Sequence, residues 1–99
     1  MVKVRYINKE LETLFTKSNS PTFQSLQSKT VFLKSLFAFK ELLLFIDNVM
    51  DLRIYQWLHL RRGSDYSSVT IEGSGLKGDV LFKEAENGSS IILYDLIIQ

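Results

Sequence analysis

The second half of the chain alternates apolar and polar residues, and short turns divide this alternation into four segments. Such alternation is typical of strands that bury one face. We expect strands at Arg53 to Arg61, Tyr66 to Ile71, Asp79 to Glu84 and Ser90 to Ile98. The turns at residues 62–65, 72–75 and 86–88 are too short for parallel crossovers, and the last contains an Asn-Gly pair typical of hairpins. The pattern therefore predicts an antiparallel meander.

The first half of the chain predicts a short strand and two helices. Residues 2–6 alternate like a strand, and Asn8 is a suitable N-cap for a helix over residues 9–17. A second helix is expected to begin at Ser20-Pro21, because proline suits the first turn of a helix. The apolar residues from Phe23 to Val49 are too dense for a helix with one exposed face, so we expect this long helix to be largely buried.

The size of the chain limits the fold to one modest core. With 99 residues we expect a single domain over residues 1–99, and 45% hydrophobic content is that of a globular protein. The predicted class is α+β, with a short N-terminal strand and two helices packed on a C-terminal antiparallel sheet. The apolar segment at residues 42–46 is too short to span a bilayer. Together with the absence of cysteine, this favours a cytoplasmic protein without a membrane role.

Charge gives no general attraction to nucleic acid, since twelve basic residues oppose eleven acidic ones. Any RNA contact must then come from a local basic patch. The basic residues that could form such a patch in the second half are Arg53, Arg61, Arg62 and Lys77.

The single histidine, His59, is the first candidate for chemistry. Alternation in the predicted strand 53–61 places it on the more polar face, beside Trp57 and Arg61. Imidazole titrates near neutral pH, so on an open basic face it can serve as general acid or base in RNA cleavage. A strand histidine without any chemical role is the alternative that the residues leave open.

The pair Tyr94-Asp95 in the last predicted strand is the second candidate. A phenol and a carboxylate can orient a substrate or assist proton transfer. In a regular strand the two side chains point to opposite faces, so only one can share a site with His59 unless the strand is bulged. A buried tyrosine beside a charged edge residue is the alternative. Metal-ligand spacing, a phosphate loop and a nucleophile elbow are all missing from the sequence, so we expect neither metal nor cofactor.

The order of strand, two helices and antiparallel hairpins resembles the RelE/ParE superfamily of bacterial toxins, and most closely its HigB-like branch. The segments that carry the resemblance are Leu11 to Phe15, Leu33 to Leu36, Trp57 to Gly63, Tyr66 to Ile71, Asp79 to Phe82 and Ile91 to Asp95. The resemblance implies the toxin of a type II toxin–antitoxin pair, a ribosome-dependent mRNA endonuclease that an antitoxin protein neutralises. Its RNA-binding residues would be Arg53, Arg61, Arg62 and Lys77.

The same resemblance implies His59, Tyr94 and Asp95 as catalytic residues. His59 and Gly63 hold the places of a Leu-His-x-Leu-x-Gly type segment of HigB-like toxins, and Tyr94-Asp95 is similar to the end of their last strand. Two departures stand out: the final histidine of that strand is missing, and Asp79 stands where an arginine usually helps to bind RNA.

These departures motivate a second hypothesis, a catalytically degenerate RelE-like protein that acts as a protein-binding module of phage or mobile-element origin. Trp57 and Tyr55, on the predicted exposed face, would be its interface residues, because aromatic side chains dominate binding hot spots.

Overall fold

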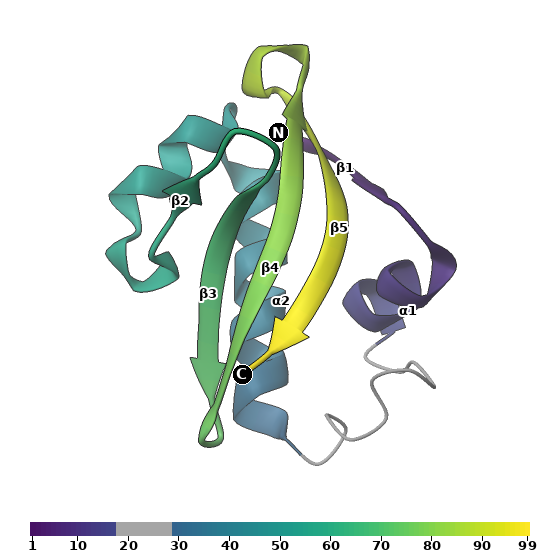
Figure 1. Cartoon of the computed structure of the whole chain (residues 1–99), viewed down its shortest axis with the longest axis vertical. Coiled ribbons are helices and arrows are strands. Elements are labelled where there is room, and N and C mark those ends of the chain that lie inside the picture. The colour runs from purple at the N-terminus through teal and green to yellow at the C-terminus, as the bar shows by residue number, and fades with distance from the viewer. Residues whose placement is uncertain (18–28) are drawn as a thin grey trace.

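The computed structural model of the chain describes residues 1–17 and 29–99 and has the predicted α+β class (Figure 1). Its elements in chain order are β1 (Lys3–Tyr6), α1 (Lys9–Lys17), α2 (Thr30–Phe45), the 3₁₀ helices η2 (Val49–Ile54) and η3 (Gln56–Leu58), β2 (Arg61–Arg62), β3 (Ser67–Gly73), β4 (Leu76–Ala85), the 3₁₀ helix η4 (Glu86–Gly88) and β5 (Ser90–Ile98). The predicted helix start at Ser20-Pro21 lies outside the described residues. Among the described helices, none is both long and apolar enough to cross a bilayer.

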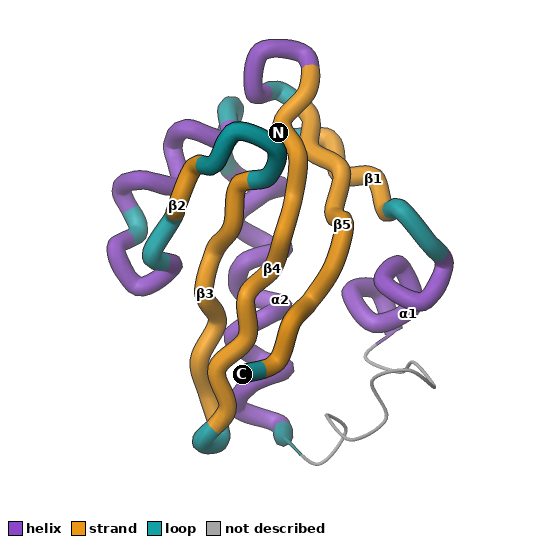
Figure 2. The backbone as a smooth tube through the Cα atoms, viewed as in Figure 1, coloured by secondary structure: helices purple, strands orange, loops and turns teal. Residues whose placement is uncertain are grey.

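The five strands form one mixed sheet in the order β1-β5-β4-β3-β2 (Figure 2). The pairs β2–β3, β3–β4 and β4–β5 are antiparallel, which confirms the predicted meander except that its first strand is only the two-residue β2. β1 adds to the far edge in parallel with β5, where Val4 lies opposite Ile91. A parallel neighbour is possible here because most of the chain separates the two strands in sequence.

Helix α2 covers one face of the sheet, and no described helix covers the other (Figure 1). The residues of α2 that are buried against the sheet are Phe32, Leu33, Leu36, Phe39 and Leu43. The helix is less buried than the predicted largely buried helix, because one side faces solvent, and Val31 and Phe45 at its two ends are 54% and 84% exposed. Below, the uncovered face of β2 to β5 is called the outer face.

The N-terminal predictions are confirmed. Helix α1 spans Lys9–Lys17, and the Asn8 side chain accepts a hydrogen bond from the Leu11 amide at 2.9 Å, as an N-cap does. Leu11, Leu14 and Phe15 are buried, so α1 presents its apolar face to the core near β1 and β5. The charged side of α1 stays in solvent, as expected for an amphipathic helix.

The predicted strand Arg53 to Arg61 is wrong. Apart from Arg61, which opens β2, its residues lie in η2, η3 and the links around them. Asn48 starts this segment, because its Oδ1 accepts the Met50 amide at 2.9 Å and its Nδ2 donates to the Asn87 carbonyl at 2.8 Å. Leu52 and Leu58 are fully buried while Ile54 is 75% exposed, so burial does not follow the alternation that predicted a strand.

The remaining boundaries differ by a few residues. The strands predicted at Tyr66 to Ile71 and Asp79 to Glu84 are Ser67–Gly73 and Leu76–Ala85, joined by a tight turn at Ser74-Gly75. The strand predicted at Ser90 to Ile98 is confirmed at both ends. Hydrogen bonds between β3 and β4 extend both strands into the polar residues that the sequence assigned to the turn.

Candidate functional site

Strand register gathers polar and charged side chains on the outer face. Arg61 lies opposite Ser68, Thr70 opposite Asp79, and Glu72 opposite Lys77. Val69, Ile71 and Val80 alternate with these residues and are fully buried on the other face. The outer face is therefore a solvent-facing surface whose chemistry is set by charged residues and not by the core.

A cleft of about 330 Å³ opens at one end of the outer face. Its lining residues are His59, Arg61, Thr70, Glu72, Lys77 and Gln99, and we call it the histidine cleft. Three residues predicted from sequence, His59, Arg61 and Lys77, come together here from the end of η3, from β2 and from β4. The cleft combines one titratable imidazole with two cations and one carboxylate.

The backbone of η3 positions His59. Its amide donates to the Gln56 carbonyl at 3.1 Å, and its φ of 48° and ψ of 53° lie in the left-handed region. Leu58 just before it is fully buried and fixes the turn to the core. A non-glycine residue in this conformation costs about 1 kcal/mol, so a local turn, and not strand alternation, directs the imidazole.

A chain of hydrogen bonds connects Arg61 to Asp79. Arg61 Nη2 donates to Thr70 Oγ1 at 3.2 Å, and the Thr70 hydroxyl donates to Asp79 Oδ1 at 2.9 Å. Gln99 Nε2 donates to the second carboxylate oxygen of Asp79 at 2.5 Å. Both oxygens of Asp79 are thus occupied, and a guanidinium has five N–H donors, so Arg61 keeps several for a ligand.

Lys77 is only loosely held in the cleft. Its Nζ lies 3.6 Å from Glu72 Oε1, and the two side chains are 54% and 55% exposed. An ion pair this exposed contributes at most about 1 kcal/mol. A phosphate oxygen entering the cleft can therefore replace Glu72 as the partner of Lys77 at little cost.

Tyr94 and Asp95 do not line the histidine cleft. Leu93 pairs with Phe82 and Asp95 with Leu81, so Tyr94 is an extra, bulged residue in β5. Asp95 accepts the amide of its own neighbour, Leu96, at 2.8 Å. The bulge breaks the regular alternation on which the sequence prediction for this pair depended.

Tyr94 belongs instead to a second cluster on the outer face, which we call the tyrosine cluster. The Tyr94 and Tyr66 rings meet edge to face with centroids 5.0 Å apart. Lys83 Nζ lies 5.1 Å from the Tyr66 centroid and 5.2 Å from the Tyr94 centroid. Lys83 lies six positions after Lys77 on β4, so the cluster and the cleft are about 20 Å apart along the strand. The structure thus distributes the predicted catalytic residues over two places.

The other two predicted RNA-binding residues lie outside the cleft. Arg62 donates from Nε and Nη2 to Glu84 Oε2 at 3.0 Å and 2.8 Å. Arg53 Nε donates to the Met50 carbonyl within η2 at 3.3 Å. Neither residue lines the histidine cleft.

Sequence reasoning missed three lining residues of the cleft, Thr70, Glu72 and Gln99. Gln99 reaches the site because its amide donates to the Lys77 carbonyl at 2.7 Å, which extends the pairing of β4 with β5. No pattern of residues near Gln99 in the sequence predicts this contact. Thr70 and Glu72 alternate with the apolar residues Val69 and Ile71, which places both on one face of the strand. With the correct strand pairing, this pattern would have predicted them as neighbours of Arg61 and Lys77.

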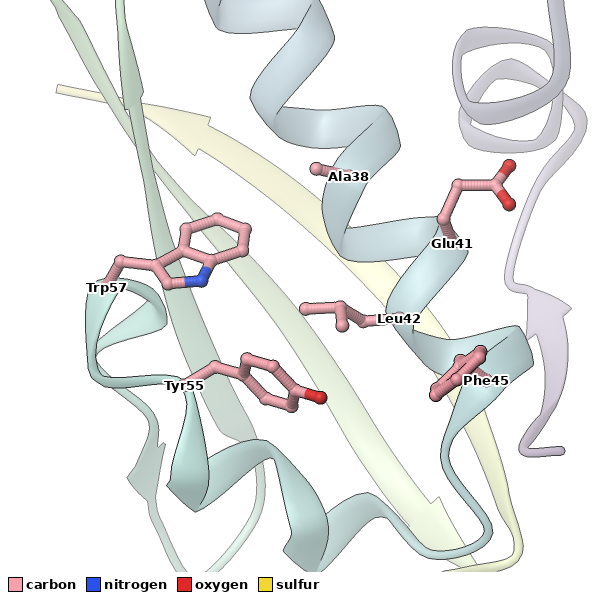
Figure 3. Close-up of a pocket in the computed structure, with 6 residues that line it drawn as sticks. All are labelled: Ala38, Glu41, Leu42, Phe45, Tyr55 and Trp57. Atoms are coloured by element: carbon pink, nitrogen blue, oxygen red, sulfur yellow. The ribbon is translucent and has the colours of Figure 1, made fainter.

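An apolar groove of about 400 Å³ lies on the helix side of the protein, between α2 and the η2–η3 segment (Figure 3). Its lining residues are Ala38, Glu41, Leu42, Phe45, Tyr55 and Trp57. Trp57 and Tyr55 extend toward Leu42, whereas the Glu41 carboxylate points away from them. The two aromatic residues do not lie on a face opposite the helices as predicted. Trp57 is 44% exposed beside α2, and Tyr55 is half-buried against the core, because the segment forms 3₁₀ turns and not a strand.

Within residues 1–17 and 29–99, no group of three His, Cys, Asp or Glu side chains is arranged to hold a metal ion. In comparisons with models of protein families, with curated proteins and with solved structures, nothing matches this chain. A functional proposal for the protein therefore depends on its own residues.

Proposed function

We propose that the protein is an endoribonuclease, the toxin of a type II toxin–antitoxin pair that cleaves mRNA on the ribosome and is neutralised by an antitoxin protein. The observation that carries the proposal is the meeting of His59, Arg61 and Lys77 in one open cleft. RNA cleavage by the 2′-hydroxyl needs a positioned proton carrier and positive charge around the scissile phosphate. The element order, strand, helices and antiparallel meander, is the one that the sequence resemblance implies.

In the proposed reaction His59 removes the proton of the ribose 2′-hydroxyl. The 2′-oxygen then attacks the adjacent phosphorus, and the bond from phosphorus to the 5′-oxygen breaks. The leaving oxygen takes a proton from the Lys77 ammonium group, which gives a 2′,3′-cyclic phosphate and a 5′-hydroxyl end. Arg61 stabilises the extra negative charge on the phosphorus centre through the donors that Thr70 leaves free.

The tyrosine cluster supports the proposal as a second contact point for the RNA strand. Aromatic faces bind unstacked bases, and Lys83 supplies a cation beside them. The distance of about 20 Å to the cleft corresponds to about three to six nucleotides of single strand. Tyr94 then positions the RNA away from the cut, and Asp95 contributes by holding the bulge that presents Tyr94.

Inducible expression of the wild type and of His59→Asn in a bacterium tests this function. Asparagine accepts the left-handed backbone of position 59 but carries no titratable ring, so the fold persists while the proton carrier is lost. We expect growth arrest and new mRNA ends with the wild type, and loss of both with the variant, since general acid–base catalysis contributes about 10²- to 10⁴-fold. Equal growth and identical mRNA ends in the two cultures would refute the proposal.

The distribution of residues favours one alternative, a catalytically degenerate protein that acts as a protein-binding module. Tyr94 and Asp95 lie away from the cleft, while Tyr55 and Trp57 line an apolar groove. Purified protein incubated with ribosomes and mRNA separates the two functions. Cleavage that disappears in His59→Asn excludes the module, whereas absence of cleavage together with a partner lost in Trp57→Ala supports it.

A further inference from the structure

The solvent side of α2 carries a ridge of five residues at alternating spacings of three and four, the spacing of a helix face that packs on another helix. These residues, which we call the α2 ridge, are Val31, Lys34, Ala38, Glu41 and Phe45. All five are exposed, and Phe45 is 84% exposed. The opposite side of α2 already fills the core, so the fold gives no reason for an apolar residue at each end of this ridge.

The apolar groove runs beside the C-terminal half of the α2 ridge (Figure 3). Val31, Phe45 and Trp57 are 54%, 84% and 44% exposed. Taking about 150–250 Å² for a whole aromatic side chain, they leave on the order of 400 Å² of apolar surface in water. This exposed apolar area is similar to that of the largest apolar patch on a typical monomer, about 300–600 Å², which is often functional.

We propose that the α2 ridge pairs with the α2 ridge of a second copy of this chain, antiparallel and about a two-fold axis at Ala38. Lys34 lies four residues before Ala38, about 6 Å along the axis, and Glu41 lies three residues after it, about 4.5 Å. In an antiparallel pair Lys34 of each copy therefore faces Glu41 of the other. Their positions along the helix axis differ by only about 1.5 Å. The same symmetry sets Val31 of one copy against Phe45 of the other.

The charges of the α2 ridge favour an antiparallel pair of helices over a parallel one. A parallel pair would set Lys34 against Lys34 and Glu41 against Glu41, which is repulsive. Neither side chain forms an ion pair with another described residue, so both can serve an intermolecular contact. Ala38 at the crossing point lets two helices approach to about 8 Å, and a net charge of +1 does not oppose self-association.

The proposed contact between the two α2 helices also accounts for the exposed apolar surface of the groove. The N-terminal half of the second copy's α2 passes along Leu42, Tyr55 and Trp57 and covers their apolar surface. Helix α2 lies on one side of the sheet (Figure 1), whereas the residues that line the histidine cleft belong to the outer face, so both clefts of the dimer stay open. Dimer formation is thus independent of the proposed RNA cleavage.

Sedimentation or light scattering of the purified chain at about 100 µM, where even a micromolar Kd fills the interface, measures the association. We expect a dimer for the wild type and at least tenfold weaker association for Lys34→Glu, which sets two carboxylates against each other. The double variant Lys34→Glu/Glu41→Lys restores the pair with the signs exchanged, so its association returns to the wild-type level. Lys9→Glu, an exposed lysine on α1, is the matched control and stays dimeric.

A monomeric wild type at that concentration, or a dimer indifferent to Lys34→Glu, overturns the proposal. A disulfide cross-link tests the position of the two-fold axis. The chain contains no cysteine, so an introduced thiol can pair only with its own copy in the second chain. Ala38→Cys brings two thiols together at the crossing point, so mild oxidation joins two chains covalently. Ser64→Cys in an exposed turn is the control, and equal cross-linking of the two variants excludes an axis at Ala38.

Discussion

Arg61 and Arg62 are adjacent in sequence and project to opposite faces of the sheet. Arg61 lies opposite Ser68 and donates to Thr70 on the outer face, whereas Arg62 lies opposite the buried Ser67 and binds Glu84. Side chains alternate along a strand, so two identical neighbours acquire different environments. One guanidinium is available to the histidine cleft, and the other is engaged in a structural ion pair.

Because the two arginines have different partners, we expect their substitution by alanine to have different effects on RNA binding. Arg61→Ala is expected to lower the affinity for single-stranded RNA at least tenfold, because a charge-assisted contact to phosphate is lost. Arg62→Ala is expected to leave the affinity within about twofold and to lower the free energy of unfolding by no more than about 1 kcal/mol. Fluorescence anisotropy with a labelled RNA and urea denaturation measure the two effects. An equal loss of affinity in both variants would contradict the separate roles.

Asp79→Asn is expected to strengthen RNA binding several-fold at low salt. The amide oxygen still accepts the Thr70 hydroxyl, but the negative charge beside Arg61 is gone. Because the gain is electrostatic, it should shrink as the salt concentration rises. Glu10→Gln on α1, far from the outer face, removes the same charge from the chain and serves as control. If both variants gained equally, net charge alone would be responsible.

Gly73→Ala is expected to destabilise the protein by about 2–3 kcal/mol, because its methyl group overpacks the contact between β3 and α2. A Cβ at this position would lie 2.7 Å from the Phe32 nitrogen and 2.8 Å from the Val31 carbonyl carbon, both backbone atoms. Gly75→Ala meets no atom within 4 Å but adopts a φ of 76°, so its cost is about 1 kcal/mol. Urea denaturation of both variants compares the two costs, and a larger loss in Gly75→Ala would argue against the close approach.

The raised pKa of Tyr6 predicts that the protein loses stability at alkaline pH. Burial, and then the nearby Glu12 carboxylate, raise the pKa of Tyr6 above its ordinary 10.0. The folded state favours the neutral phenol, so the contribution is complete below the unfolded pKa and is lost as pH rises through the raised folded pKa. As the pH rises through 10 and above, Tyr6→Phe should therefore lose less stability than the wild type in urea denaturation. Parallel pH profiles for the two proteins would show that Tyr6 makes no such contribution.

Local signals were sufficient where an element depends on its own residues. Asn8 caps α1 as predicted, and β5 has both predicted ends. The meander follows from turns that are too short for any other connection. The segment 53–61 failed because its leucines suit a strand and a series of 3₁₀ turns equally well. Asn48, which reaches Asn87 at a distant turn, decided between the two.

By itself, the sequence determined the class of the fold, the meander and the identity of the charged residues that a site could use. Tertiary structure alone decided which of them meet: strand register brought Lys77 and Gln99 to Arg61, and a bulge of one residue moved Tyr94 to Tyr66 and Lys83. The physical reason is that periodicity is a property of short segments, whereas register is set by hydrogen bonds between strands distant in sequence. His59 faces the cleft for the same kind of reason, because the buried Leu58 holds its turn in place.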